Sequence, residues 1–146
     1  MRVLIVYDSV YGNTQKIAEA IGSGIAGEVK AVKASDANLT ALSSTDLLIV
    51  GSPTQGGRPT KPVQDFITGI SESAIKGLKV ASFDTRYAGR FVKVFGFAAE
   101  RIAQSLKAKG GTMTAPPEAF FVTGKQGPLK EGELERAMRW GGEIAK

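Results

Sequence analysis

The chain contains no cysteine and no histidine. Without cysteine it forms no disulfide, no thiolate zinc site and no iron–sulfur ligation, and it has no thiol nucleophile. Without histidine it has no Ser-His-Asp triad, no imidazole metal ligand and no imidazole acid or base. Any chemistry must therefore be carried out by carboxylates, amines, hydroxyls or a bound cofactor.

Long apolar runs are also absent. The longest are short, such as residues 3–7 and 47–50, whereas a helix that crosses a bilayer needs about 18 or more apolar residues. The N-terminal residues show no charged region followed by an apolar stretch and a cleavage site, the pattern of a secretory signal. We therefore expect a cytoplasmic protein that does not bind membranes.

The composition is typical of a globular protein: 42% of the 146 residues are hydrophobic and 23% are charged. This length fits a single domain over residues 1–146. The formal net charge is +5, and residues 51–110 contain ten of the 19 basic residues but only four of the 14 acidic ones. Because the sequence has no block of consecutive basic residues and no RNA-binding aromatic strand, no nucleic-acid partner is expected.

Hydrophobic periodicity alternates between strand and helix along the chain. Strands are predicted at residues 2–8, 28–33, 46–51, 78–83 and 112–123, the last interrupted by Pro116-Pro117. Helices are predicted at residues 14–26, 62–70, 91–106 and 131–146, with a short helical connector at 36–42. This alternation predicts an α/β fold, in which a doubly wound parallel sheet has helices on both faces.

The first and last helices carry predictions about packing. Residues 22–27 match the G-x-G-x-x-G pattern of dinucleotide-binding proteins. The match ends a helix and precedes a strand, whereas the dinucleotide motif follows a strand and opens a helix. We therefore interpret these glycines as a helix stop and as positions of close packing. In the last helix, Leu134, Ala137, Met138 and Ile144 are expected to face the core.

Ligands of open parallel sheets bind outside the carboxyl ends of the strands, so the loops after the first, third and fourth strands form the candidate site. The first loop, residues 9–14, combines three hydroxyls, an asparagine and a glycine. It leads into a helix N-terminus, where free N–H groups favour an anion. It lacks the Gly-Lys-Ser/Thr ending of a Walker A loop. Taken alone, this loop is as typical of an ordinary helix cap as of a phosphate site.

The other two loops are less specific when taken singly. Residues 52–60 contain two adjacent glycines and two prolines, and residues 84–89 are small and polar with one aromatic. Each is typical of a structural loop or a solvated turn. Because the three strands end at one edge of the sheet, however, a single ligand can contact all three loops.

Together the three loops resemble those of the flavodoxin family, whose first loop has the form S/T-x-T-G-N-T and binds the phosphate of flavin mononucleotide (FMN). The resemblance covers essentially the whole chain and implies a short-chain member with five parallel strands in the order 2-1-3-4-5. It implies that the phosphate is bound by the first loop: Ser9, Val10, Tyr11, Gly12, Asn13 and Thr14. It also implies that the other loops flank the isoalloxazine ring: Pro53, Thr54, Gln55, Gly56, Gly57, Asp84, Thr85, Arg86 and Tyr87.

The sequence departs from the family pattern in three ways. Tyr11 stands where the family usually has threonine, a change that is also found in flavodoxin-like quinone reductases. Gln55 stands where an aromatic residue often covers the inner face of the flavin, which leaves Tyr87 as the candidate for stacking on the outer face. The chain is basic, whereas flavodoxins are usually acidic. Arg86 therefore either adds positive charge beside the flavin or pairs with Asp84, and Arg58 and Arg90 are further basic residues near these loops.

The function implied by the resemblance is that of an FMN-binding electron carrier, with no catalytic residue and no metal site of its own. Its expected partners are acidic redox proteins, and it is expected to be a monomer or a weak homodimer. Two alternatives remain open at this stage. One is an FMN-dependent NAD(P)H:quinone reductase of the same fold, and the other is a flavodoxin-like binding module that carries no flavin.

Overall fold

The structure is a computed structural model that describes residues 1–87 and 97–146. The described strands are β1 (Arg2–Tyr7), β2 (Glu28–Lys33), β3 (Leu47–Pro53), β4 (Lys79–Tyr87), β5 (Thr112–Met113) and β6 (Glu118–Val122). The described α-helices are α1 (Asn13–Ser23), α2 (Lys61–Gly69), α3 (Glu72–Ile75), α5 (Ala98–Ala108) and α6 (Glu133–Ile144). Two short 3₁₀ helices, η1 (Ala34–Asp36) and η2 (Leu39–Ser44), connect β2 to β3.

The strands form a parallel sheet in the order β2-β1-β3-β4-β5, which confirms the predicted fold class and strand order. The predicted fifth strand is divided in two. Its first part, β5, pairs with the start of β4, and its second part, β6, pairs with residues 83–87 of the same strand. Pro116-Pro117 lies between the two parts, because proline cannot donate a hydrogen bond to a sheet.

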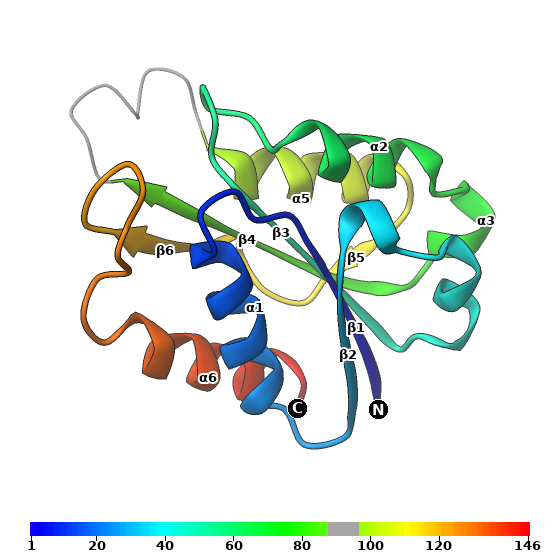
Figure 1. Ribbon diagram of the computed structural model, residues 1–146. Coiled ribbons are helices and arrows are strands. Elements are labelled where there is room, and N and C mark those ends of the chain that lie inside the picture. The colour runs from blue at the N-terminus through cyan, green and yellow to red at the C-terminus, as the bar shows by residue number, and fades with distance from the viewer. Residues whose placement is uncertain (88–96) are drawn as a thin grey trace.

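The central strands are buried on both faces, as their continuous apolar sequences predict. Because side chains alternate along a strand, Ile5 and Ile49 enter one hydrophobic cluster whereas Val6 and Val50 enter the other. Helices α1 and α6 cover the first face, and α2, α3 and α5 cover the second (Figure 1). None of the helices in the described residues is long and apolar enough to cross a membrane.

Aromatic side chains fill the core between the sheet and α6. Phe83, Phe120 and Trp140 form three edge-to-face pairs with centroid distances of 6.0–6.3 Å. The prediction that Leu134 and Met138 face inward was wrong, because their exposed fractions are 42% and 43%. The buried face of α6 is instead formed by Ala137, Trp140, Gly141 and Ile144, and at Gly141 the helix backbone approaches α1 closely.

The bounds of α1 and β4 are among those that differ from the predicted ones. Helix α1 ends at Ser23, three residues earlier than predicted. Strand β4 extends to Tyr87, four residues past its predicted end at Phe83, because this polar segment pairs with β6. The predicted long helix is described only from Ala98, and the part that contains Phe91 and Phe95 lies outside the described residues.

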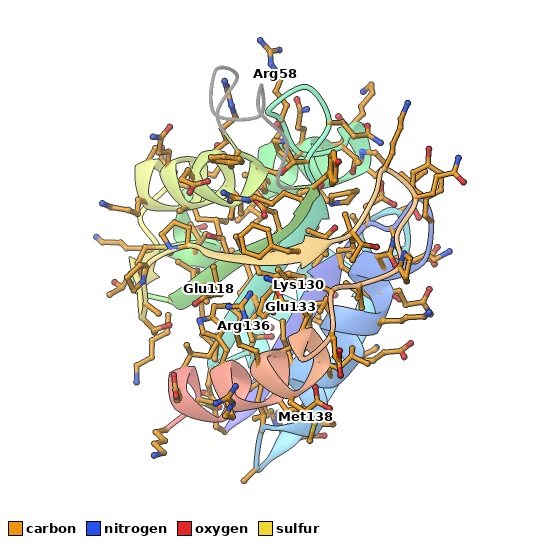
Figure 2. All side chains as sticks on the ribbon, turned by 90° about the vertical axis from the view of Figure 1, so that its left-hand side faces the viewer. Arg58, Glu118, Lys130, Glu133, Arg136 and Met138 are labelled. Atoms are coloured by element: carbon orange, nitrogen blue, oxygen red, sulfur yellow. The ribbon has the colours of Figure 1, made fainter. Side chains whose placement is uncertain are left out.

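An ion-pair cluster attaches α6 to β6, as Figure 2 shows. Arg136 donates to Glu133 (Nη2–Oε2, 2.7 Å) and to Glu118 (Nη1–Oε1, 3.0 Å). Glu133 also accepts a hydrogen bond from the backbone N–H of Phe121 at 2.8 Å. Burial alone would raise the pKa of Glu133, but its hydrogen bonds from Arg136 and Phe121 outweigh burial and lower it.

Glycines allow α1 and α6 to touch backbone to backbone. A Cβ on Gly141 would lie 2.3 Å from the carbonyl oxygen of Ile21, and a Cβ on Gly24 would lie 2.0 Å from that of Met138. A Cβ on Gly22 would lie 3.2 Å from the side chain of Val29. Gly22 and Gly24 are therefore packing positions, as predicted from their place at the end of a helix.

We expect Gly141→Ala to lower the free energy of unfolding by about 1–3 kcal/mol, because the added methyl group must separate the two helices. Alanine would stabilise an isolated helix at this position, so a loss of stability reports the tertiary contact. Gly69→Ala is the control, since its Cβ would meet only the flexible end of Leu39 at 3.2 Å. Urea unfolding measures both variants, and a Gly141→Ala variant as stable as the parent would contradict the assigned packing.

Candidate functional site

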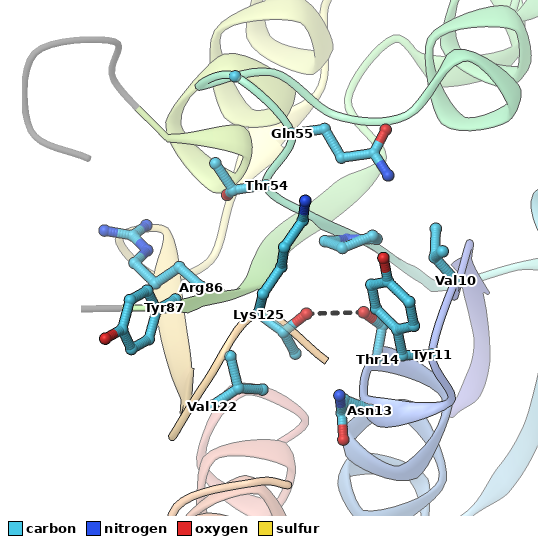
Figure 3. Close-up of a pocket in the computed structure, with 13 residues that line it drawn as sticks. Val10, Tyr11, Asn13, Thr14, Thr54, Gln55, Arg86, Tyr87, Val122 and Lys125 are labelled. Atoms are coloured by element: carbon cyan, nitrogen blue, oxygen red, sulfur yellow. Dashed lines mark hydrogen bonds between the residues drawn. The ribbon is translucent and has the colours of Figure 1, made fainter. Parts of the chain in front are cut away.

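A cavity of about 590 Å³ opens at the carboxyl ends of β1, β3 and β4 (Figure 3). This is the edge of the sheet where ligands of open parallel sheets bind. The wall is formed by the first loop, the segment after β3, the end of β4 and the segment after β6. Its lining residues are Val10, Tyr11, Asn13, Thr14, Pro53, Thr54, Gln55, Gly56, Thr85, Arg86, Tyr87, Val122 and Lys125.

Most of the residues predicted to hold a flavin meet at this cavity. Four of them do not line it: Ser9, Gly12, Gly57 and Asp84. Conversely, Val122 and Lys125 line the cavity although the sequence analysis did not select them. The three loops chosen from the sequence therefore converge, and a fourth segment joins them.

The first loop presents free backbone N–H groups at the N-terminus of α1. Gly12 precedes the helix with a φ of +89°, in the left-handed region that favours glycine. Ser9 Oγ accepts a hydrogen bond from the N–H of Gln15 at 3.3 Å, so it satisfies one N–H group of the first helical turn. Within the described part of the chain, the N–H groups of Asn13 and Thr14 have no acceptor. Such a helix terminus favours an anion.

A pair of hydroxyl groups joins the first loop to β4. Thr14 Oγ1 and Thr85 Oγ1 lie 2.7 Å apart, and both residues are buried (Figure 3). This hydrogen bond uses only one of the two hydroxyl protons. The other proton can be donated to a ligand, so the pair adds a hydroxyl donor close to the free N–H groups.

The segment after β3 forms a tight turn at the cavity. Gln55 and Arg58 exchange two backbone hydrogen bonds, of 2.8 and 3.0 Å, around Gly56 and Gly57. The φ values of these glycines are +57° and +80°, the left-handed pair that a type I′ turn requires. Thr54 N–H also donates to the carbonyl oxygen of Thr85 at 3.0 Å, which ties the segment to β4.

Asp84 was predicted to lie in a loop beside the flavin, but it is a fully buried residue of β4. Its carboxylate accepts two hydrogen bonds from Arg86, at 2.8 and 2.7 Å, and one from Ala99 N–H at 2.9 Å. Burial raises the pKa of Asp84, and these hydrogen bonds oppose that rise. Asp84 thus serves as an anchor between β4 and the start of α5.

Of the two alternatives for Arg86, the structure shows the ion pair. Besides its two bonds to Asp84, its guanidinium contacts Glu100 at 3.3 Å and lies 3.4 Å from the ring centroid of Phe97. Its side chain is only 10% exposed. The positive charge of Arg86 is therefore compensated before any ligand binds. Arg58 is exposed and does not line the cavity, and Arg90 lies outside the described residues.

Exposed apolar side chains line the cavity near its mouth. Tyr11 and Tyr87 are about half exposed and lie on opposite sides of the cavity in Figure 3. Val10, also about half exposed, lies beside Tyr11. Tyrosine rings provide flat apolar surfaces while their hydroxyls remain in water. The cavity is therefore suited to a ligand with a flat, partly apolar portion.

The lining residues that were not predicted from the sequence lie at the carboxyl end of the fifth predicted strand. Val122 ends β6, and Lys125 belongs to the turn after it. Asn13 Nδ2 donates to the carbonyl oxygen of Gln126 at 3.1 Å, which brings this turn to the first loop. The carboxyl-end rule applies equally to the fifth strand, and its loop, with Gly124 and Gly127, contained the signal that was overlooked.

The described lining residues include no carboxylate, and the described chain contains no cluster of three acidic side chains able to hold a metal ion. The cavity offers hydrogen-bond donors, aromatic surface and one lysine. This set is suited to binding an anionic, partly aromatic ligand.

Comparisons with known proteins support this interpretation. Residues 5–140 match the family model described as flavodoxin. The flavodoxin of Clostridium beijerinckii is 39% identical over 84 residues, which are 54% of this chain and 60% of that protein. A putative diflavin flavoprotein of Synechocystis is 37% identical over 71 residues, 44% of this chain and 12% of that protein. The chain thus spans less than two thirds of either relative.

A solved structure gives a fuller comparison. A flavodoxin from the domain Archaea matches with a TM-score of 0.82 and 26% identity. The match covers 99% of this chain and 96% of the archaeal chain. The similarity therefore includes every described element of the sheet and its helices.

We expect Arg86→Met to lower the free energy of unfolding by about 3–5 kcal/mol at neutral pH, because Asp84 would keep a buried charge without its partner. Without Arg86 the folded-state pKa of Asp84 rises further. Folding then favours protonated Asp84, so the contribution of this carboxyl group to stability is full at and below pH ~4, around its unfolded pKa, and falls as pH rises toward neutrality.

Urea unfolding between about pH 4 and pH 7 measures this pH dependence as a difference from the parent protein. The double variant Asp84→Asn/Arg86→Met is the control, because it lacks the titrating carboxyl group and should lose the additional pH dependence. A pH-independent difference between Arg86→Met and the parent would contradict the assigned role of the ion pair.

Proposed function

Because this chain belongs to the flavodoxin family, we propose that it binds FMN in the cavity and carries electrons between redox partners. The observation that carries the proposal is the combination of a free helix N-terminus with two aromatic side chains in one cavity at the carboxyl edge of the sheet. An anion site and a flat apolar site, side by side, match the two ends of FMN.

The residues present fit FMN. At the phosphate end, the N–H groups of Asn13 and Thr14 and the Thr14–Thr85 hydroxyl pair would hold the anion. At the ring end, the 53–56 segment and Tyr87 would flank the isoalloxazine. Ser9 and Gly12 would act indirectly, by shaping the first turn of α1.

When bound, FMN would supply the redox chemistry, and the chain would supply binding, orientation and electrostatics. The backbone donors of α1 would orient the phosphate end, and the tyrosines would limit the access of water to the ring end. The described lining has no carboxylate that would act as an acid or base. This favours a carrier of electrons over an enzyme that moves protons with its own side chains.

The proposal extends to the partners. The concentration of basic residues in residues 51–110 favours acidic redox proteins, because opposite charges steer and orient an encounter. A cytoplasmic location and a monomeric or weakly dimeric state are parts of the proposal that rest on the sequence.

Absorption spectra and turnover assays test this function. The purified protein should bind added FMN and show a flavin spectrum that reduction bleaches and re-oxidation restores. With FMN bound, it should not sustain NAD(P)H oxidation by a quinone. Sustained turnover would support the reductase instead, and a protein that binds no FMN would support the flavin-free module.

We expect the protein to bind FMN at least about tenfold more tightly than riboflavin, because hydrogen bonds to a charged group contribute about 1.5–3 kcal/mol each. Thr14→Val should weaken FMN binding about tenfold and leave riboflavin binding nearly unchanged. Quenching of flavin fluorescence measures both dissociation constants. Thr68→Val, at an exposed position on α2, is the control and should bind both ligands like the parent.

Equal affinities of the parent protein for FMN and riboflavin would show that the α1 terminus does not hold the phosphate. A Thr14→Val variant that loses both ligands equally would assign Thr14 to the shape of the cavity rather than to the anion.

A further inference from the structure

The cavity wall has an uncompensated positive charge at a position that the flavodoxin resemblance did not indicate. Two cations occur among the described lining residues, Arg86 and Lys125. Arg86 is paired with Asp84 and Glu100. Lys125 is exposed and has no carboxylate partner in the part of the chain that the structure describes.

The backbone that carries Lys125 is held in place. Thr123 N–H donates to the carbonyl oxygen of Pro128 at 2.8 Å, which closes the turn after β6. Asn13 Nδ2 donates to the carbonyl oxygen of Gln126, the residue next to Lys125. A Cβ on Gly127 would lie 2.6 Å from Asn13 Nδ2, so the turn and the first loop are in tight contact. The lysine therefore starts from a defined point on the cavity wall.

The side chain of Lys125 extends across the cavity. In Figure 3 it runs toward Thr54 and Gln55 and away from Asn13. Its amine thus lies on the side that the proposed function assigns to the isoalloxazine ring, and not on the side of the phosphate.

We propose that the ammonium group of Lys125 stabilises the reduced, negatively charged form of a flavin bound in this cavity. The inference rests on the proposed function, namely that FMN binds there. A flavin ring that takes up two electrons and one proton carries one negative charge, whereas the oxidised ring is neutral. The ammonium group of Lys125 favours the charged form over the neutral one, and so raises the reduction potential of the bound flavin.

The test compares Lys125→Met, which keeps the length of the side chain and removes its charge, with Lys125→Arg, which keeps the charge. Lys130→Met is the matched control, because Lys130 is exposed five residues further on and does not line the cavity. The two-electron midpoint potential of bound FMN is measured at low and high salt, by equilibration with dithionite and a dye of known potential.

Lys125→Met should lower the affinity for reduced FMN, relative to oxidised FMN, about threefold to tenfold, which corresponds to ~15–30 mV for a two-electron couple. The shift should shrink at high salt, because mobile ions screen an exposed charge. Lys125→Arg should restore the parent potential, and Lys130→Met should not change it.

A parent-like potential in Lys125→Met, with FMN still bound, would overturn this inference and leave the proposed function intact. An equal shift in Lys130→Met would also overturn it, because the effect would then be one of net charge. A parent protein that binds no FMN would overturn the proposed function, and this inference with it.

Discussion

The buried carboxylate of Asp84 is the constraint on which the site depends. It is fully buried in β4, and it accepts hydrogen bonds from Arg86 and from the N–H of Ala99 in the first turn of α5. A charge in such a place is tolerated only with its partners, because removing a carboxylate from water costs several kcal/mol. The folded site therefore requires that β4, the start of α5 and the guanidinium group of Arg86 are all placed to bond to this carboxylate. Thr54 adds to this junction by accepting a hydrogen bond from Ala98 N–H at 3.1 Å.

The same ion pair decides the charge of the cavity. Arg86 lies in the wall, yet its charge is neutralised by Asp84 and Glu100, and its face stacks on Phe97. Although the sequence has an excess of basic residues, Arg86 therefore adds no uncompensated positive charge to the cavity. The uncompensated positive charge comes from Lys125 instead. The turn after β6 is held by a hydrogen bond from Asn13, and the side chain of Lys125 extends into the cavity. The charge in the cavity is therefore set by one lysine rather than by the net charge of +5 of the whole chain.

The sequence predicted the fold well, because the sheet is built from continuous apolar runs whose burial leaves few alternatives. The runs of β1 and β3 identified the central strands, and the carboxyl-end rule identified most of the cavity wall. Prediction from the sequence failed where polar residues are buried or where segments far apart in the chain come into contact. Asp84 and Arg86 look like a solvated turn, because periodicity cannot show that they neutralise each other inside a strand. Lys125 was missed because the hydrogen bond that holds its turn at the cavity, from Asn13 to the carbonyl oxygen of the neighbouring Gln126, joins residues far apart in the chain.

The position of that turn also depends on α6. Strand β6 lies at the edge of the sheet and is short, so hydrogen bonds to β4 alone hold it weakly. Glu133 accepts the N–H of Phe121, and Arg136 bridges to Glu118 and to the carbonyl oxygen of Ala119, so that the helix secures the strand from outside the sheet. Helix α6 is in turn held against α1 by the close approach at Gly141. Asn13, the first residue of α1, also donates a hydrogen bond to this turn. The turn that carries Lys125 is therefore held by α1 in two ways, directly through Asn13 and indirectly through α6. The helix whose N-terminus favours the anion therefore also determines where the cation of the cavity lies.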